Sequence, residues 1–364
     1  MARHRRITAI LAFCIAACGD SGLSEFNGAP VPPPPALGQE ERIRIVGSST
    51  VAPFSTTVAE QFGASTRFAT PIVETTGTGG GFKAFCTGIG PQTPSISNAS
   101  RRVKPSELAL CTQAGVTELV EVQIGFDGIV LATGKDGPDL DLTKEQIWRA
   151  LAAEIPDGQG GWKANDTDRW SDLSPALPDL AIRVSGPPPT SGTRDAFVEI
   201  AMELGAEAVP EMAALAQSDP DAFHRRATTV RMDGAWVDSG ENDTAIIQIL
   251  INNPTIVGVL GFSSADQNGD RVKAAQISGV TPTFEAIASG EYKISRSMYF
   301  YVKAQNVGLV PGLTAYIAAF TNDDAWGPEG YLAEKGLIPL PQAERARVRR
   351  DAAALTLLDT AGEG

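Results

Sequence analysis

The sequence is poor in several residue types that common functions require. Only two of its 364 residues are histidine, His4 and His224, which argues against histidine-rich zinc sites and most Ser-His-Asp arrangements. Lysine and arginine total 30 against 43 aspartates and glutamates, a net charge of −13, whereas binding to nucleic-acid phosphates needs a basic surface. Aromatic residues make up 7%, few for stacking single-stranded bases. We therefore expect no nucleic-acid partner.

Common enzyme motifs are also missing. The sequence contains no GxxxxGK[ST] loop, no GxSxG elbow and no HExxH pair, the patterns of Walker-type nucleotide binding, α/β-hydrolases and zinc proteases. Hydrophobic residues are 43% and charged residues 20%, ordinary values for a globular chain of two or three domains, or of two lobes. We predict a globular protein that is not an enzyme and that uses no cofactor and no metal ion.

The N-terminus has the order of an export signal. Arginines at positions 3, 5 and 6 precede an apolar run over residues 7–17, which is shorter than the roughly 20 residues that span a bilayer. The sequence Ile15-Ala16-Ala17-Cys18 resembles the lipobox of bacterial lipoproteins. This resemblance implies that residues 1–17 are a lipoprotein signal peptide and that Cys18 is lipidated. The alternative is an ordinary cleavage site followed by an incidental cysteine.

A polar, proline-rich stretch follows the cysteine. Proline occupies position 30 and positions 32–35, which predicts an extended tether over residues 18–40 that could hold a globule up to roughly 60 Å from its anchor. Removing residues 1–17 takes away three arginines and no acidic residue, so the mature net charge is −16. We expect a periplasmic or other extracytoplasmic protein that an N-terminal lipid attaches to the membrane.

Cys86 and Cys111 are the remaining cysteines. In an exported protein, a leftover pair predicts a disulfide, and this one would enclose a loop that contains residues 97–102. The alternative is two buried free thiols.

Three segments share the order strand, polar turn, helix, as expected of an α/β protein. Their turns, residues 48–50, 77–81 and 187–193, offer hydroxyls and backbone N–H groups at the positive ends of helix dipoles, which is a ready anion site. Ser and Thr are also good N-caps, so each turn could simply cap its helix, but three turns indicate convergence on one oxyanion. Apolar segments at residues 128–132, 256–260 and 298–302 predict further strands.

The motifs resemble a known family. Val-Gly-Ser-Ser-Thr-Val-Ala-Pro-Phe at residues 46–54, Gly-Thr-Gly-Gly-Gly-Phe-Lys at 77–83, Asn-Ala-Ser-Arg at 98–101, Ser-Gly-Thr at 191–193 and the segments 233–243 and 294–303 occur in the order seen in Pst-type phosphate-binding proteins. The resemblance covers roughly residues 42–345. It implies an α/β, type II periplasmic-binding-protein fold, with two lobes, a ligand cleft and hinge strands. Lobe 1 would comprise residues 41–124 plus 292–348, lobe 2 residues 125–291, and a C-terminal tail residues 349–364.

The resemblance also implies the residues that bind phosphate. They are Ser49, Thr50, Val51, Thr78, Gly79, Ser100, Arg101, Ser191, Gly192, Thr193 and Arg194.

Two positions depart from the best-known members of the family. Arg101 stands where those members have an aspartate that accepts the phosphate proton, and Pro187 replaces an arginine. We therefore predict that Arg101, and with it Arg194, balances the charge of the anion. Phosphate can be preferred over sulfate only if another acceptor, such as Asp127, Asp195 or Glu241, takes its proton. The alternative for Arg101 is a pair with a structural carboxylate or an outward orientation.

The sequence as a whole predicts the substrate-binding component of an ABC importer that binds inorganic phosphate. The protein would be a monomer that docks on membrane permease subunits. Because a charge of −16 repels phosphate at long range, affinity must come from dense local donors in a dry cleft. The alternatives are a receptor for another tetrahedral oxyanion, such as sulfate, and an extracytoplasmic phosphate-ester hydrolase. The missing nucleophile–base pairs and metal-ligand clusters argue against the hydrolase.

Overall fold

The computed structural model describes residues 42–240 and 243–359. The signal peptide, Cys18, the tether and Glu241 lie outside the described residues, as does the end of the chain beyond Asp359. In the described part of the chain, no helix has the length and apolar character needed to cross a membrane.

The first half of the main sheet is built from three parallel strands and two antiparallel ones. β1 (Arg44–Gly47) pairs in parallel with β2 (Ile72–Thr75) and β3 (Ile96–Ala99). β13 (Ser295–Lys303) runs antiparallel to β3 and to β4 (Leu119–Gly134). Parallel neighbours need crossover connections, and the helices α1 (Ala52–Ser65) and α2 (Gly77–Phe85) provide them.

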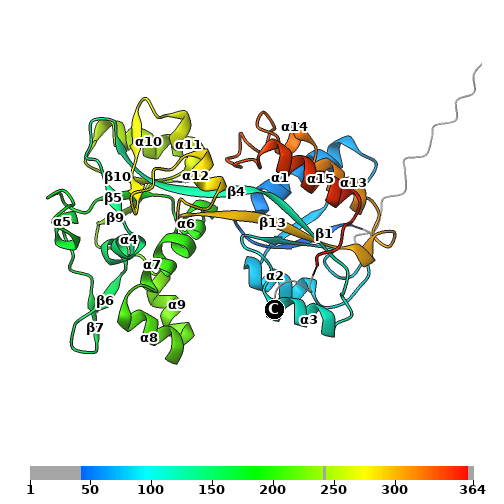
Figure 1. The fold of residues 1–364 in the computed structure, drawn as a ribbon, viewed down its shortest axis with the longest axis horizontal. Coiled ribbons are helices and arrows are strands. Elements are labelled where there is room, and N and C mark those ends of the chain that lie inside the picture. The colour runs from blue at the N-terminus through cyan, green and yellow to red at the C-terminus, as the bar shows by residue number, and fades with distance from the viewer. Residues whose placement is uncertain (1–41, 241–242, 360–364) are drawn as a thin grey trace, which may run out of the picture. The chain divides into compact units, whose positions relative to one another are not determined.

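The second half of the sheet begins where β4 continues past residue 128. There β4 pairs with β10 (Val257–Gly261), and the strands β8 (Val184–Gly186) and β9 (Trp236–Asp238) follow in parallel. The strand order is therefore β2-β1-β3-β13-β4-β10-β8-β9, with β11 (Val272–Ala274) paired to the end of β4. β4 belongs to both halves (Figure 1). This arrangement confirms the expected α/β fold of two lobes joined by hinge strands. The lobe boundaries stay predictions, and the one at residue 124 falls inside β4.

The remaining elements surround these strands. They are α3 (Pro105–Gln113), β5 (Asp141–Leu142), α4 (Lys144–Leu151), β6 (Glu154–Pro156), β7 (Trp162–Ala164), α5 (Trp170–Leu173), α6 (Gly192–Phe197), the π-helical η2 (Val198–Glu203), α7 (Leu204–Ala206), α8 (Pro210–Ser218), α9 (Pro220–Thr228), α10 (Asp243–Asn252), α11 (Phe262–Gln267), β12 (Gln276–Ile277), α12 (Phe284–Ala288), the 3₁₀ turn η3 (Ala304–Asn306), α13 (Leu313–Phe320), α14 (Asp323–Trp326) and α15 (Gln342–Ala353).

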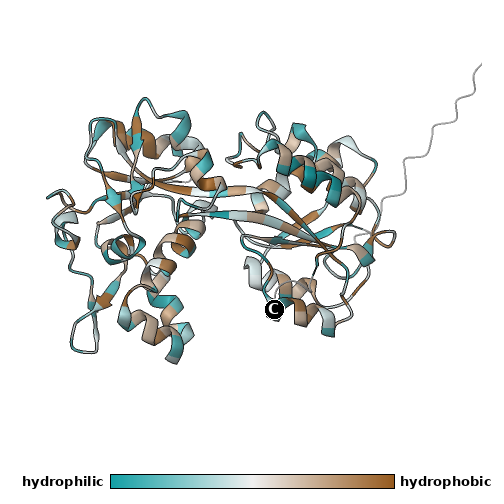
Figure 2. Cartoon of the chain, in the orientation of Figure 1, coloured by the Kyte–Doolittle hydropathy of each residue, from teal (hydrophilic) through white to brown (hydrophobic). Residues whose placement is uncertain are grey.

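The core is apolar on the strands and on the inner faces of the helices. Figure 2 shows hydrophobic residues along β4 and hydrophilic ones on much of α15. A separate small cluster, which includes Val46, Phe82, Phe85 and Tyr301, packs α2 and α3 against the sheet. Burial of such side chains stabilises the fold by about 1.5 to 3 kcal/mol each. The first turn of α2 is therefore fixed by the packing of its helix against the sheet.

The structure joins Cys86 and Cys111 in a disulfide, which confirms that prediction. Cys86 follows the last residue of α2, Cys111 lies in α3, and both are almost fully buried. The bridge therefore ties together the two helices that flank residues 97–102.

Removing the disulfide should destabilise the protein. The bridge links residues 25 positions apart, and the chain-entropy model assigns roughly 3 kcal/mol to a loop of this size. In urea, we expect the variant Cys86→Ser/Cys111→Ser to lose about 3 kcal/mol of unfolding free energy. Wild type that has been reduced serves as the control and should match the variant. An unchanged unfolding free energy would show that the bridge adds no stability.

Lys303, near the end of β13, is a fully buried lysine. Its ammonium group donates hydrogen bonds to the Gly88 carbonyl and to Thr93 Oγ1 and lies 4.9 Å from the centre of the Phe85 ring. Burial disfavours the charged form and lowers the pKa of Lys303 to about 8.

This lysine should make stability depend on alkaline pH. The pKa in the unfolded chain is near 10.5 and in the folded protein about 8, so between these values the unfolded state binds more protons and stability rises with pH. Relative to Lys303→Met, wild type should gain on the order of 3 kcal/mol from pH 8 to 10.5. The exposed Lys163, changed to Met, is the control and should leave the wild-type slope intact. Parallel curves for wild type and Lys303→Met would contradict the expectation.

Candidate functional site

The first predicted anion turn lies between β1 and α1. Gly47 has a φ of +128°, and a Cβ there would lie 2.2 Å from the Asn98 carbonyl oxygen, so only glycine lets β1 approach β3 this closely. Ser48 N donates to that same carbonyl at 3.0 Å. Val51 precedes α1, and within the described residues no side chain caps this helix. The first N–H groups of α1 itself are not free, because Ala52 N donates to the Ser48 carbonyl at 3.0 Å, Phe54 N donates to the Val51 carbonyl at 3.1 Å, and Pro53 has no N–H. Any backbone donor to an anion at this turn must therefore come from the residues that precede α1.

The second turn and the end of β3 come together beside the first. Thr78 is in the first turn of α2, and its Oγ1 lies 3.1 Å from Ser100 Oγ and accepts the Ser100 N–H at 3.2 Å. Both side chains are buried. Gly79 follows Thr78 in the same helical turn. The structure thus assembles two hydroxyls from segments that are 22 residues apart.

The third turn faces the first from the other half of the sheet. Ser191 caps α6, where its hydroxyl accepts the Thr193 N–H at 3.2 Å. A Cβ on Gly192 would lie 3.7 Å from the Ser49 carbonyl oxygen and 3.8 Å from Thr50 Cα. This close approach brings backbone of the two lobes face to face.

Two cavities meet at this junction. One, of about 550 Å³, is lined by Ser48, Thr78, Ser100 and Arg194 among others. The other, of about 760 Å³, is lined by Thr50, Asp127 and residues 190–193 among others. Ser49 and Asp195 line both, and the Ser49 hydroxyl donates to the Asp195 carboxylate at 2.8 Å. Eight of the eleven predicted residues line one or both cavities, whereas Val51, Gly79 and Arg101 line neither.

Arg101 is engaged by a structural carboxylate. Its two terminal nitrogens donate to the two oxygens of Glu107 at 2.9 and 2.8 Å, and Glu107 also accepts the Lys104 N–H at the start of α3. The hydrogen bonds to Glu107 raise the pKa of Arg101. This is the pairing that the sequence analysis kept as an alternative, and a direct contact between Arg101 and the anion stays a prediction.

Arg194 lies beside Pro187, the position at which the best-known members of the family have an arginine. The guanidinium lies 4.2 Å from the Trp236 ring centre, donates to the Pro187 carbonyl at 3.3 Å and is 3.5 Å from Asp238. The side chain is 9% exposed, and burial lowers the pKa of Arg194, although a guanidinium stays charged in proteins. Arg194 thus brings a positive charge to the cavity from lobe 2.

Arg296 was not among the predicted binding residues, but it contacts one of them. Arg296 lies on β13 opposite Asp127 of β4, and its Nη2 donates to Thr50 Oγ1 at 2.7 Å. Nη1 pairs with Glu199, and Nε lies 3.5 Å from Asp127. The side chain is only 10% exposed. A hinge strand therefore supplies a buried cation that touches the first anion turn.

Asp127 has a carboxylate oxygen, the buried Oδ2, that accepts no hydrogen bond from the described residues. Burial raises the pKa of Asp127, and the neighbouring Arg296 offsets part of this rise. Asp195, by contrast, already accepts the Ser49 hydroxyl. Of the two predicted proton acceptors that the structure describes, Asp127 is the better placed.

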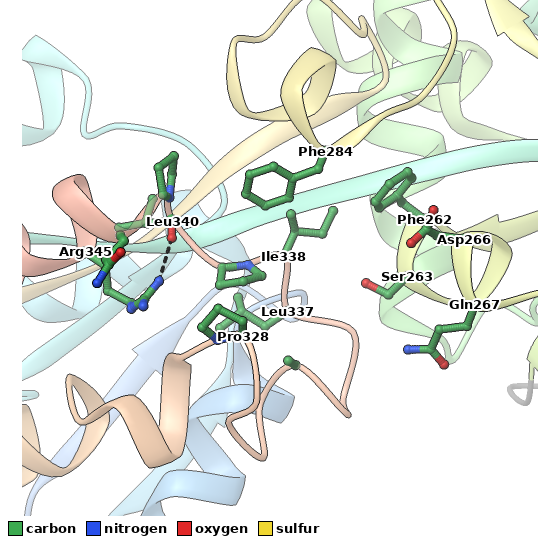
Figure 3. Close-up of a pocket in the computed structure, with 14 residues that line it drawn as sticks. Phe262, Ser263, Asp266, Gln267, Phe284, Pro328, Leu337, Ile338, Leu340 and Arg345 are labelled. Atoms are coloured by element: carbon green, nitrogen blue, oxygen red, sulfur yellow. Dashed lines mark hydrogen bonds between the residues drawn. The ribbon is translucent and has the colours of Figure 1, made fainter.

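A third cavity, of about 690 Å³, has a different character. Phe262, Phe284, Leu337 and Ile338 form its apolar wall (Figure 3). Its lining contains none of the predicted site residues among those that the structure describes. Ile338 exchanges backbone hydrogen bonds with Phe126 on β4, so this cavity lies beside the hinge strand. Within residues 42–240 and 243–359, no three His, Cys, Asp or Glu side chains form a group that could hold a metal ion.

The fold and this interlobe site define a class of binding proteins, and the chain belongs to the PBP superfamily, because the model of the PBP superfamily domain matches residues 31–324. The chain is similar to protein SphX of Synechococcus elongatus, with 27% identity over 312 residues, 84% of this chain and 80% of that protein. It is also similar to phosphate-binding protein PstS of Staphylococcus saprophyticus, with 27% identity over 336 residues, 91% of this chain and 87% of that protein.

A solved structure supports the fold. The crystal structure of a possible phosphate binding protein from Planctomyces limnophilus has a TM-score of 0.67 and 24% identity, and the match covers 86% of this chain and 98% of that one. The resemblance to Pst-type phosphate-binding proteins that the motifs predicted is confirmed.

Proposed function

We propose that this protein is the extracytoplasmic substrate-binding component of an ABC importer and that it binds inorganic phosphate in the cleft between its lobes. The observation that carries the proposal is the meeting of three hydroxyl- and amide-bearing turns beside the buried guanidinium of Arg296. The name of the PstS relative, a phosphate-binding protein, agrees with that chemistry.

In this proposal, neutral donors and two arginines share the ligand. Ser49, Thr50, Val51, Thr78, Gly79 and Ser100 bind from lobe 1, and Ser191, Gly192 and Thr193 bind from lobe 2. Arg194 and Arg296 balance the charge of a dianion, and Arg101 supports the second turn through Glu107. Charge-assisted hydrogen bonds in a low-dielectric cleft are about twice as strong as neutral ones, so local donors overcome the repulsion from a mature charge of −16.

Thermal unfolding in the presence of oxyanions tests this function. Phosphate at a thousand times its dissociation constant should stabilise the protein by about 4 kcal/mol, and equimolar sulfate should have a smaller effect. Stabilisation by sulfate but not by phosphate would favour a receptor for another oxyanion.

Incubation with 4-nitrophenyl phosphate should release no nitrophenol beyond the buffer rate, because the proposal includes no catalysis. Turnover would favour the hydrolase.

The proposal includes a lipid on Cys18, with monomers that dock on permease subunits. In membrane fractionation, Cys18→Ser should move the protein from the membrane to the soluble fraction, because a single serine cannot carry the anchor. Substituting Ser21 with Ala, three residues away, should leave the wild-type distribution unchanged. Retention of Cys18→Ser on membranes after a carbonate wash would contradict the lipid anchor.

A further inference from the structure

Two carboxylates on one helical stretch of lobe 2 occupy donors of the anion site. Asp195 of α6 accepts the Ser49 hydroxyl at 2.8 Å, and Glu199, one turn later, pairs with Nη1 of Arg296. Residues four apart share one face of a helix, and both carboxylates line the cavity of about 550 Å³. Both contacts reach across from lobe 2, to the first anion turn and to the hinge strand β13.

Carboxylates in an anion site need an explanation, because their charge repels the ligand. An ionised carboxylate only accepts hydrogen bonds, and the unprotonated oxygens of an oxyanion likewise only accept. Each of these two carboxylates therefore takes a hydrogen bond that an oxyanion would otherwise receive. The carboxylates also stabilise the protein when no ligand is bound, because a buried guanidinium left without a partner is strongly destabilising.

We propose that Asp195 and Glu199 are internal counter-anions, which hold Ser49 and Arg296 until an oxyanion displaces them. The inference rests on the proposed function. The Glu199 side chain is 49% exposed, so it can rotate into solvent when the ligand arrives. The ligand must displace both carboxylates. Its apparent affinity is therefore reduced by the fraction of molecules in which the donors are free. Weakly bound monovalent anions gain too little at these donors to displace them.

The same geometry argues against these carboxylates as direct ligands. Asp195 Oδ2 accepts from Ser49 and Glu199 Oε2 accepts from Arg296, so each carboxylate already holds a protein donor. None of the described residues hydrogen-bonds the buried Oδ2 of Asp127, which lies 3.5 Å from Arg296 Nε. Removing their charge should therefore strengthen binding, whereas removing a direct ligand should weaken it.

Calorimetric titration of phosphate into Asp195→Asn and Glu199→Gln tests the inference. We expect each variant to bind phosphate about 3- to 30-fold more tightly than wild type, because a competitor and a like charge are gone. Without phosphate, Glu199→Gln should melt at a lower temperature than wild type, because Arg296 loses a partner. A purely structural role of Glu199 would not produce tighter phosphate binding together with a lower melting temperature in the absence of phosphate.

Glu203→Gln is the matched control. Glu203 lies one turn further along the same stretch and pairs with His224 at 3.2 Å, so its substitution should leave the phosphate affinity at the wild-type value. Weaker or unchanged binding by both Asp195→Asn and Glu199→Gln, with normal binding by wild type, would overturn the inference alone. Absence of phosphate binding by wild type would overturn the proposed function as well.

Discussion

Replacing Arg296 with glutamine should weaken phosphate binding about a hundredfold or more. The substitution removes a charged donor and leaves Asp127 and Glu199 without their cation beside the ligand. Loss of a charged hydrogen bond costs about 1.5 to 3 kcal/mol, and breaking a buried pair costs about 3 to 5 kcal/mol, where 1.4 kcal/mol is about tenfold in affinity. Titration calorimetry measures the effect, and Arg296→Lys should fall between wild type and glutamine, because lysine keeps the charge but not the fork.

Arg345 offers a matched control for this prediction. Its side chain is also 10% exposed and also pairs with an aspartate, Asp323. Arg345→Gln should therefore lower stability and leave the phosphate affinity within about twofold of wild type, because substitutions remote from a site rarely couple to it. Equal, small effects on affinity from Arg296→Gln and Arg345→Gln would show that Arg296 is a structural residue of the hinge.

Replacing Asp127 with asparagine should collapse the preference for phosphate over sulfate. At neutral pH phosphate carries a proton that a carboxylate can accept, whereas sulfate carries none and is repelled. An asparagine amide can donate to sulfate instead. We expect phosphate to lose about 1.5 to 3 kcal/mol of binding, which is roughly tenfold to a hundredfold, and sulfate to bind more tightly than it binds wild type. Competition between labelled phosphate and sulfate measures both changes.

Asp243→Asn is the control for the loss of a negative charge near the same cavity. Asp243 lines the cavity that Asp127 lines, but it accepts the Gly261 N–H at 3.3 Å and serves the start of α10. Its substitution should leave the selectivity ratio intact. An unchanged ratio in Asp127→Asn, or an equal change in Asp243→Asn, would mean that another group accepts the proton.

The anion turns were predictable because local sequence and sheet geometry suffice for them. Ser49 and Thr78 follow the parallel strands β1 and β2, whose carboxyl ends lie at one sheet edge. Ser191 follows β8, which runs in the opposite direction in the other half of the sheet. The strands predicted at residues 128–132 and 298–302 lie within β4 and β13, and the one predicted at 256–260 overlaps β10 from residue 257. The disulfide followed from cysteine counting in an exported chain.

The pairing of Arg296 with Asp127 could not be predicted, because it depends on strand register. Arg296 and Asp127 face each other only because β13 and β4 pair antiparallel in one register, and nothing local in either segment shows it. A one-residue slip would turn both side chains to the opposite face of the sheet. Sequence reasoning named Asp127 only as one of three carboxylates.

The partner of Arg101 did leave a local trace. Glu107 follows Lys104 and Pro105, a position where an acidic side chain caps the first turn of a helix. Such a carboxylate, six residues from Arg101, is well placed to pair with it. The helix cap therefore indicates the ion pair of Arg101, while the contact with the anion that the family position implies stays a prediction.

Titration of inorganic phosphate into the purified wild-type protein is the most direct measurement of the central claim. The account predicts one phosphate bound per chain, with a dissociation constant in the micromolar range or tighter, corresponding to about −8 kcal/mol or better. Ser191→Ala or Thr193→Val, which each lose a donor of the third turn, should bind phosphate about ten- to a hundredfold more weakly. No detectable binding of phosphate to wild type at millimolar concentration would contradict the account.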